Sequence, residues 1–207
     1  MNAEKKLTEL KREDIIEAAT KEFKTSGFRA TSMDRIAATA QVSKRTVYNH
    51  FASKEVLFQA ITQELCDRAM QISEYPYNPE IPVRDQLQSI SRQEISLLCS
   101  TEFLDMVKMI TSESLASPDL TRANFENFQD TGIGVVKWII EACKDGQLTL
   151  TDPVMAGKQF LALIETFALW PQLYGVKPAP KKQEQQIIID SAVEMFLSHY
   201  AGDDQCG

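Results

Sequence analysis

The chain has 207 residues, 43% of them hydrophobic and 25% charged, which is ample for one large or two small packed domains. Its net charge of −7 argues at first against a nucleic-acid partner, but the charge is unevenly spread. Residues 24–54 hold six basic side chains against one acid, a net of +5, so the rest of the chain carries −12. Attraction to phosphate is therefore confined to one segment.

Other classes of protein are disfavoured by what the sequence lacks. The N-terminus is charged and has no apolar region typical of a secretory signal. The longest apolar stretches, 133–143 and 160–170, are interrupted by Lys137 and Glu165, so no membrane span is expected and the protein is predicted to be cytoplasmic. The cysteines lie far apart without a CxxC pair, so we expect reduced thiols, with redox sensing by one of them left open: Cys66, Cys99, Cys143 and Cys206.

The first predicted helix covers residues 11–25 and stops at Gly27, a residue suited to a helix C-terminus. Ile15, Ala19 and Phe23 recur at helical spacing and are predicted to face inward. Residues 1–10 are expected to be frayed.

Residues 31–54 predict two short helices joined by a tight turn. Thr31 can cap the first helix, with Asp34 three residues later completing a capping box, and Ser43 can cap the second. On the second helix Val47 and Phe51 are predicted to point inward, which leaves a polar and basic face for phosphates and base edges. The predicted DNA-binding residues are Thr31, Ser32, Ser43, Lys44, Arg45, Thr46, Tyr48, Asn49, His50 and Lys54.

A fourth helix, 53–73, is predicted to connect two domains, 1–55 and 56–207. Three prolines, Pro76, Pro79 and Pro82, then block helix formation. Helical periodicity returns and predicts helices over 83–98, 101–116, 119–145 with a break near the glycines at 132 and 134, 152–174 and 181–200. Asp152 followed by Pro153 marks the start of one of them. The expected fold is all-α: a three-helix DNA-binding domain and a larger helical domain.

Several segments together resemble the TetR family of transcriptional regulators. They are residues 11–23, Ser26-Gly27-Phe28, Ile36-Ala37, Val42-Ser43, Thr46-Val47-Tyr48, Phe51 and Ser53-Lys54-Glu55. The family usually has glycine in the turn, where Gln41 stands, and often glycine where Arg45 stands. Gln41 at a positive φ would cost on the order of 1 kcal/mol. Arg45 would place a bidentate donor on the reading helix, where guanine is its natural partner.

The resemblance implies a homodimer that binds a palindromic double-stranded DNA operator and releases it when a small-molecule effector binds. The effector would shift the fourth helix and change the separation of the two reading heads. Lys54, with Tyr48 and His50, matches positions that mainly touch the DNA backbone.

The C-terminal domain is predicted to bind the effector and to dimerise. Its aromatic and methionine residues can each be core, and helical domains also leave clefts that bind small molecules. The ligand-binding candidates are Phe103, Met106, Phe128, Trp138, Phe160, Glu165, Phe167 and Trp170. The last helix is apolar over a wide stripe, which favours a symmetric interface. The dimer candidates are Phe167, Ile189, Val193 and Phe196.

Two alternatives remain at this point. A protein-interaction adaptor of the same fold would have lost the basic exposed residues, and here they are present. An enzyme on a helical bundle is disfavoured, because the chain has two histidines, His50 and His199, and no nucleophile motif or phosphate loop. No metal site and no cofactor are predicted. The effector, the operator sequence and the direction of control do not follow from the sequence.

Overall fold

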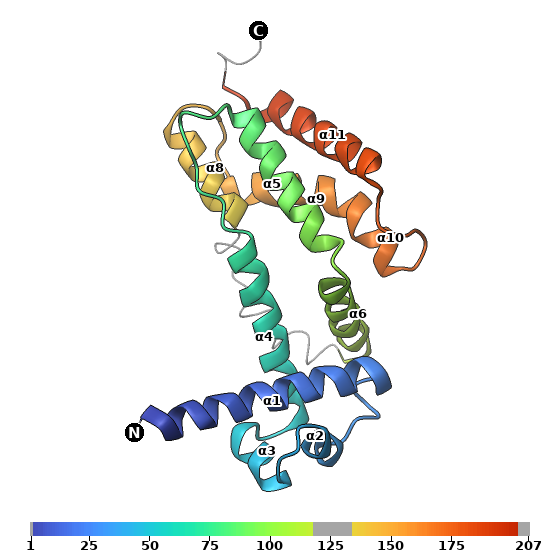
Figure 1. Ribbon diagram of the computed structural model, residues 1–207. Helices are drawn as coiled ribbons and strands as arrows, with labels where there is room; N and C mark the ends of the chain where they lie inside the picture. The colour runs from blue at the N-terminus through green and yellow to red at the C-terminus, as the bar shows by residue number, and fades with distance from the viewer. Residues whose placement is uncertain (1, 118–133, 203–207) are drawn as a thin grey trace. The chain divides into compact units, whose positions relative to one another are not determined.

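The computed structural model describes residues 2–117 and 134–202, apart from the side chains of residues 2–6, 65 and 68–71. This part of the chain forms ten helices and no strand, so the predicted all-α fold is confirmed (Figure 1). None of the described helices is long and apolar enough to cross a lipid bilayer. Phe128 and Cys206 lie outside the described residues.

The described helices pack as two compact units. The first contains α1 (Asn2–Ser26), α2 (Met33–Thr39), α3 (Lys44–His50), α4 (Lys54–Ile72) as far as Cys66, and α6 (Thr101–Ala116) from Asp105 onward. The first unit reaches further along α4 than the predicted functional division, 1–55 and 56–207, which stays a prediction. The reason is that Leu57, Phe58 and Ile61 of α4 are fully buried in the first unit.

Three aromatic rings lie at the centre of the first unit. Phe23 of α1, Phe28 of the following loop and Phe58 of α4 have ring centroids 5.1 to 6.1 Å apart. Burial of each such side chain stabilises the fold by about 1.5–3 kcal/mol. Four further buried residues of this unit come from α1, α2, α3 and the position directly after α3: Ile15, Ile36, Val47 and Phe51. The two short helices therefore belong to the same compact unit as the long ones.

Local backbone chemistry sets the ends of the short helices. Gly27 has φ 80° and ends α1, as predicted. Gln41, in the turn between α2 and α3, has φ 54° and is the only non-glycine residue at positive φ in the described chain. The side chain of Ser43 caps α3 by accepting the Thr46 N–H at 3.0 Å, also as predicted.

Two sequence predictions about this unit are wrong. α1 begins at Asn2 rather than Lys11, because residues 2–10 contain good helix formers and no glycine or proline to stop the helix. The cap of α2 is Ser32, whose Oγ accepts the Arg35 N–H at 3.2 Å, and it is not Thr31. The two hydroxyl residues are adjacent, so sequence alone placed the cap one residue early.

The second unit contains the end of α4, α5 (Val83–Leu98), the start of α6, α8 (Gly134–Lys144), α9 (Pro153–Ala168), α10 (Trp170–Leu173) and α11 (Lys182–Tyr200). Asp152 caps α9 and Pro153 opens it, as predicted. The single helix predicted over 152–174 is instead divided at Leu169. Pro171 has no N–H to continue the α-helical ladder, which accounts for the break. The predicted helix over 119–145 lies partly outside the described residues, which contain its end as α8.

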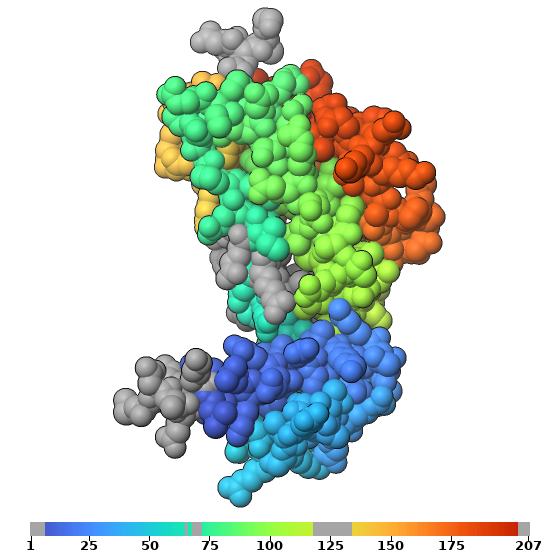
Figure 2. All heavy atoms as spheres, viewed as in Figure 1, coloured from blue at the N-terminus to red at the C-terminus, as the bar shows by residue number. Residues whose placement is uncertain are grey.

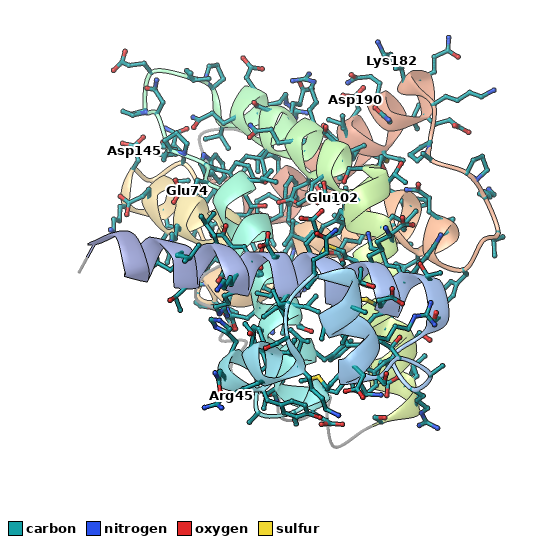
Figure 3. All side chains as sticks on the ribbon, turned by 60° about the horizontal axis from the view of Figure 1, so that its bottom comes forward. Arg45, Glu74, Glu102, Asp145, Lys182 and Asp190 are labelled. Atoms are coloured by element: carbon teal, nitrogen blue, oxygen red, sulfur yellow. The ribbon has the colours of Figure 1, made fainter. Side chains whose placement is uncertain are left out.

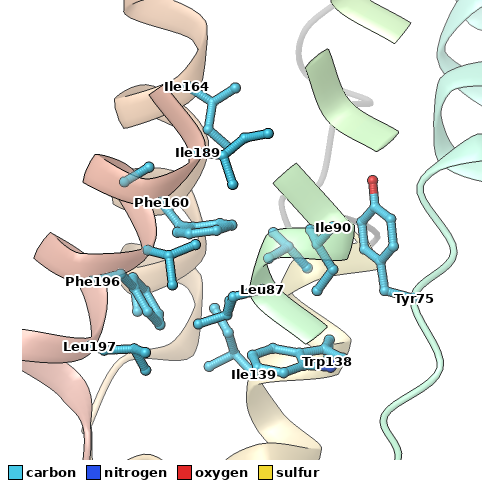
Figure 4. Packing of buried hydrophobic residues seen from close by; sticks show 14 of the residues in the cluster. Tyr75, Leu87, Ile90, Trp138, Ile139, Phe160, Ile164, Ile189, Phe196 and Leu197 are labelled. Atoms are coloured by element: carbon cyan, nitrogen blue, oxygen red, sulfur yellow. The ribbon is translucent and has the colours of Figure 1, made fainter. Parts of the chain in front are cut away.

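The core of the second unit is built from the inner faces of α5, α8, α9 and α11 (Figure 4). Phe160 of α9 and Phe196 of α11 meet edge to face with centroids 5.0 Å apart. Trp138 of α8 is 1% exposed and donates its indole N–H to Gln86 Oε1 at 3.0 Å. The amide of Gln86 also donates to the carbonyls of Asn78 and Ile81, which fixes the proline-rich loop against this core.

The side chains predicted for the dimer interface on α11 point into this core. Ile189, Val193 and Phe196 are at most 3% exposed, because they pack against α5 and α9 of the same chain. Their assignment to a subunit interface is therefore wrong. Phe167 on α9, by contrast, is 59% exposed.

Candidate functional site

The reading helix α3 presents a polar face at the surface of the first unit. Val47 is fully buried and fixes the rotation of the helix. Figure 2 shows the α2–α3 segment, in light blue, at the surface. Four predicted DNA-binding residues of α3 are exposed and two are half-buried: Lys44, Arg45, Tyr48 and Asn49, then Thr46 and His50. Ser32 and Ser43 are exposed at the two caps.

Arg45 is the basic residue of α3 that the described chain leaves unengaged. Its side chain extends away from the ribbon in Figure 3 and forms no hydrogen bond or ion pair with any described residue. Lys44, one residue earlier, pairs with Asp34 of α2 at 2.7 Å, and this hydrogen bond raises the pKa of Lys44. Because the pair is exposed, it costs little to break when a phosphate arrives. Both side chains can therefore reach DNA, and Arg45 can do so without breaking a contact with another described residue.

Thr31 and Lys54 have structural partners instead of free polar groups. The Thr31 side chain is buried and its hydroxyl donates to the Gly27 carbonyl at 2.9 Å. The Lys54 ammonium donates to the carbonyls of Phe28, Arg29 and Thr31 at 2.7, 3.3 and 2.9 Å. An ammonium has three donors, and all three are used within the protein. Both residues therefore hold the loop between α1 and α2, and their contacts with DNA stay a prediction.

A buried carboxylate connects α2 to α1. Glu22 of α1 is 8% exposed, and its Oε2 lies 2.5 Å from Arg35 Nε. Its Oε1 accepts the Thr39 hydroxyl at 2.7 Å. Sequence reasoning did not find this role of Glu22, although the residue lies one position before Phe23 on the face that packs inward. The pair fixes both ends of α2 against α1.

The predicted ligand-binding residues that the structure describes differ in their surroundings. Trp138 and Phe160 lie in the core of the second unit, and Phe160 is 0% exposed, so its side chain lines no space that water can enter. Phe103 packs against this core, and Met106 is buried in the first unit. Trp170 is 41% exposed and stacks on Tyr174.

A polar cluster that sequence reasoning missed lies inside the second unit. Glu94 of α5 is 8% exposed and accepts hydrogen bonds from the Tyr75 hydroxyl at 2.5 Å and the Ser73 hydroxyl at 3.0 Å. Burial, followed by the nearby charge of Glu94, raises the pKa of Glu165 on α9. A signal was available, because Glu94 follows Leu87, Ile90 and Ser91 at helical spacing on the buried face of α5.

Two of the described cysteines, Cys99 and Cys143, have the character of poorly reactive thiols. Burial raises the pKa of both Cys99 and Cys143, which lowers the thiolate fraction that oxidants attack. Cys66, Cys99 and Cys143 form no disulfide in the described chain. Nothing in their arrangement favours redox sensing.

Two capped short helices with an exposed polar face, held on a long first helix, define a helix-turn-helix DNA-binding unit. Residues 15–61 match the family described as bacterial regulatory proteins, tetR family. Residues 85–202 match a second description, AefR-like transcriptional repressor, C-terminal domain. This chain belongs to the TetR family of transcriptional regulators.

Solved structures agree with this membership. A TetR family transcriptional regulator from Pseudomonas syringae pv. tomato is 39% identical and superposes with a TM-score of 0.77 over 92% of this chain and 96% of its own. The flavonoid-responsive regulator FrrA is 28% identical, with a TM-score of 0.78 over 93% and 98% of the two chains. The HTH-type regulator YhgD of Bacillus subtilis is 38% identical over 73 residues, which span 35% of this chain and 38% of YhgD.

Replacement of Arg45 by alanine is predicted to relax base preference. A bidentate contact to one base discriminates by about 1–3 kcal/mol, so Arg45→Ala should weaken the preferred operator and bring one base position toward equal affinity for all four bases. The measurement is affinity for the operator and for its single-base variants at fixed salt. Equal weakening of every duplex would mean that Arg45 contacts the backbone.

Replacement of Lys54 by methionine is predicted to act on stability. The variant keeps a side chain of similar length but loses three hydrogen bonds and the ammonium that lies 4.4 Å from the Phe28 ring centroid. We expect the free energy of unfolding to fall by about 1–3 kcal/mol, with the salt dependence of DNA binding unchanged. Urea denaturation and a salt titration measure the two effects. Unchanged stability with a log–log slope lower by about 0.9 would restore Lys54 to the phosphate contacts.

Replacement of Glu165 by glutamine is predicted to stabilise the protein at neutral pH. Because the folded-state pKa of Glu165 is raised, its ionised form opposes folding once the pH exceeds the unfolded-state pKa. The gain from Glu165→Gln should therefore be present at pH 7.5 and shrink as the pH falls toward 4.5. Urea denaturation across this range is the measurement, and Glu80→Gln in an exposed loop is the matched control. A gain that grows on acidification contradicts the assignment.

Proposed function

We propose that this chain is a homodimeric repressor that binds a palindromic DNA operator and is released by a small-molecule effector. The observation that carries the proposal is the outward face of α3, where Arg45 has no partner in the described chain while Val47 fixes the helix from beneath. The exposed basic residues favour DNA binding over an adaptor role. The family is one of transcription factors, so we propose no enzymatic activity and a cytoplasmic location with the DNA.

Dimerisation is proposed through the outer faces of α9 and α11, which are neighbours in the second unit. Their exposed apolar residues are Met155, Phe167, Ile187 and Met195, between 52% and 69% exposed. Side chains of this kind left in solvent promote aggregation, and a two-fold axis would bury them against their own copies. We also propose the functional division into a DNA-binding domain, 1–55, and an effector-binding and dimerisation domain, 56–207.

The effector class is open to direct test. FrrA is named a flavonoid-responsive regulator, so flavonoids and other aromatic compounds are the first to try. The polar cluster around Glu94 offers hydrogen-bonding groups within an apolar core, as effector sites do.

The experiment is selection of bound duplexes from a random DNA pool, followed by a screen for compounds that release the selected operator. We expect a palindrome whose half-sites are about one helical turn apart, bound with a steep salt dependence. Failure to enrich any duplex, or binding that does not change with salt, would contradict DNA-binding function.

Disruption of the outer face of α11 is predicted to give monomers. A double change, Ile187→Glu with Met195→Glu, places charges on exposed positions and leaves the inner face intact. We expect half the mass by light scattering, unchanged helical content, and weaker operator binding because one head contacts only one half-site. Gln93→Glu on the exposed face of α5 is the control. A soluble dimer in the double variant would place the interface elsewhere.

A further inference from the structure

The loop between α1 and α2, residues 27–32, holds the ends of two other helices. The Arg29 guanidinium donates a hydrogen bond from Nη2 to the carbonyl of Ala116, the last residue of α6, at 2.7 Å. Lys54, the first residue of α4, donates to three carbonyls of the same loop. The C-terminus of α6, through the Arg29 side chain, and the N-terminus of α4, through the loop carbonyls, are therefore attached to the same short loop.

The chemistry of the α6 terminus suits this contact. The last carbonyls of a helix accept no hydrogen bond from the backbone of that helix, and they carry partial negative charge. A guanidinium supplies both a donor and a compensating positive charge. Among the described residues, the Arg29 guanidinium forms no hydrogen bond or ion pair other than this one.

The position of this loop connects the contact to DNA reading. Ser32 at the end of the loop caps α2, and α2 leads through Gln41 into α3. α6 itself begins at Thr101 in the second unit and enters the first at Asp105, so one continuous helix belongs to both. A displacement of α6 along its axis would pull on the segment that starts the two DNA-reading helices.

We propose that Arg29 is a positioning residue that couples α6 to the DNA-reading helices, so that operator binding and attachment of the α6 terminus stabilise each other. The inference rests on the proposed function, because it supplies the route by which that function would be regulated. The two effects are equal in size by thermodynamic linkage. The factor by which detachment of α6 weakens DNA binding is the same as the factor by which bound DNA disfavours detachment.

The test is hydrogen exchange of the peptide that covers residues 108–117, measured with and without an operator selected from the random pool. In the wild type we expect the operator to slow this exchange. In Arg29→Ala the exchange of the free protein should rise about threefold to tenfold, and the operator should no longer slow it. Arg29→Lys keeps a charged donor and should restore part of the effect. Lys21→Ala removes an exposed charge from α1 and should behave as wild type.

Salt titration separates this role from a phosphate contact. If Arg29 couples helices, Arg29→Ala lowers operator affinity without changing the log–log salt slope. A slope reduced by about 0.9 with unchanged exchange in residues 108–117 would place Arg29 on the DNA backbone and overturn the proposal. If no operator is found, the proposed function fails. In that case, equal exchange in free wild type and Arg29→Ala would overturn the attachment itself.

Discussion

The DNA-binding unit depends on one ammonium group. Lys54 donates to three carbonyls of the loop between α1 and α2, and its charge lies over the ring of Phe28, a member of the aromatic core. The loop so fixed ends at the cap of α2. The direction of α2, and through the turn at Gln41 that of α3, therefore depends on a residue at the start of α4. Glu22 adds a second attachment, which holds α2 against α1 through Arg35 and Thr39.

Most of the fold could be predicted because single residues set the ends of helices through their local chemistry. The bounds of α5 and α6 agree with the prediction to the residue, and Gly27, Ser43 and Asp152 act as predicted. The break at Leu169 was not predicted from the sequence, although Pro171 indicates it. The apolar stripe of α11 was recognised, but periodicity cannot tell whether a stripe faces its own chain or a partner. That question depends on tertiary packing, which placed Val193 inside.

The candidate site was predictable in outline and not in detail. Exposure of Lys44, Arg45, Tyr48 and Asn49 follows from the inward Val47, whose position sets the rotation of the helix. The role of Lys54 could not be inferred, because its partners are backbone carbonyls 23 to 26 residues away. The burial of Glu94 was accessible to helical periodicity, whereas its hydroxyl partners from the loop after α4 were not.

The completeness of the second unit's core has a consequence for assembly. Since the inner face of α11 is covered by α5 and α9 of the same chain, a subunit owes none of this core to a partner. Separation of the proposed dimer, with its interface on the outer faces of α9 and α11, would leave this core covered, so folded subunits could part and rejoin with other copies.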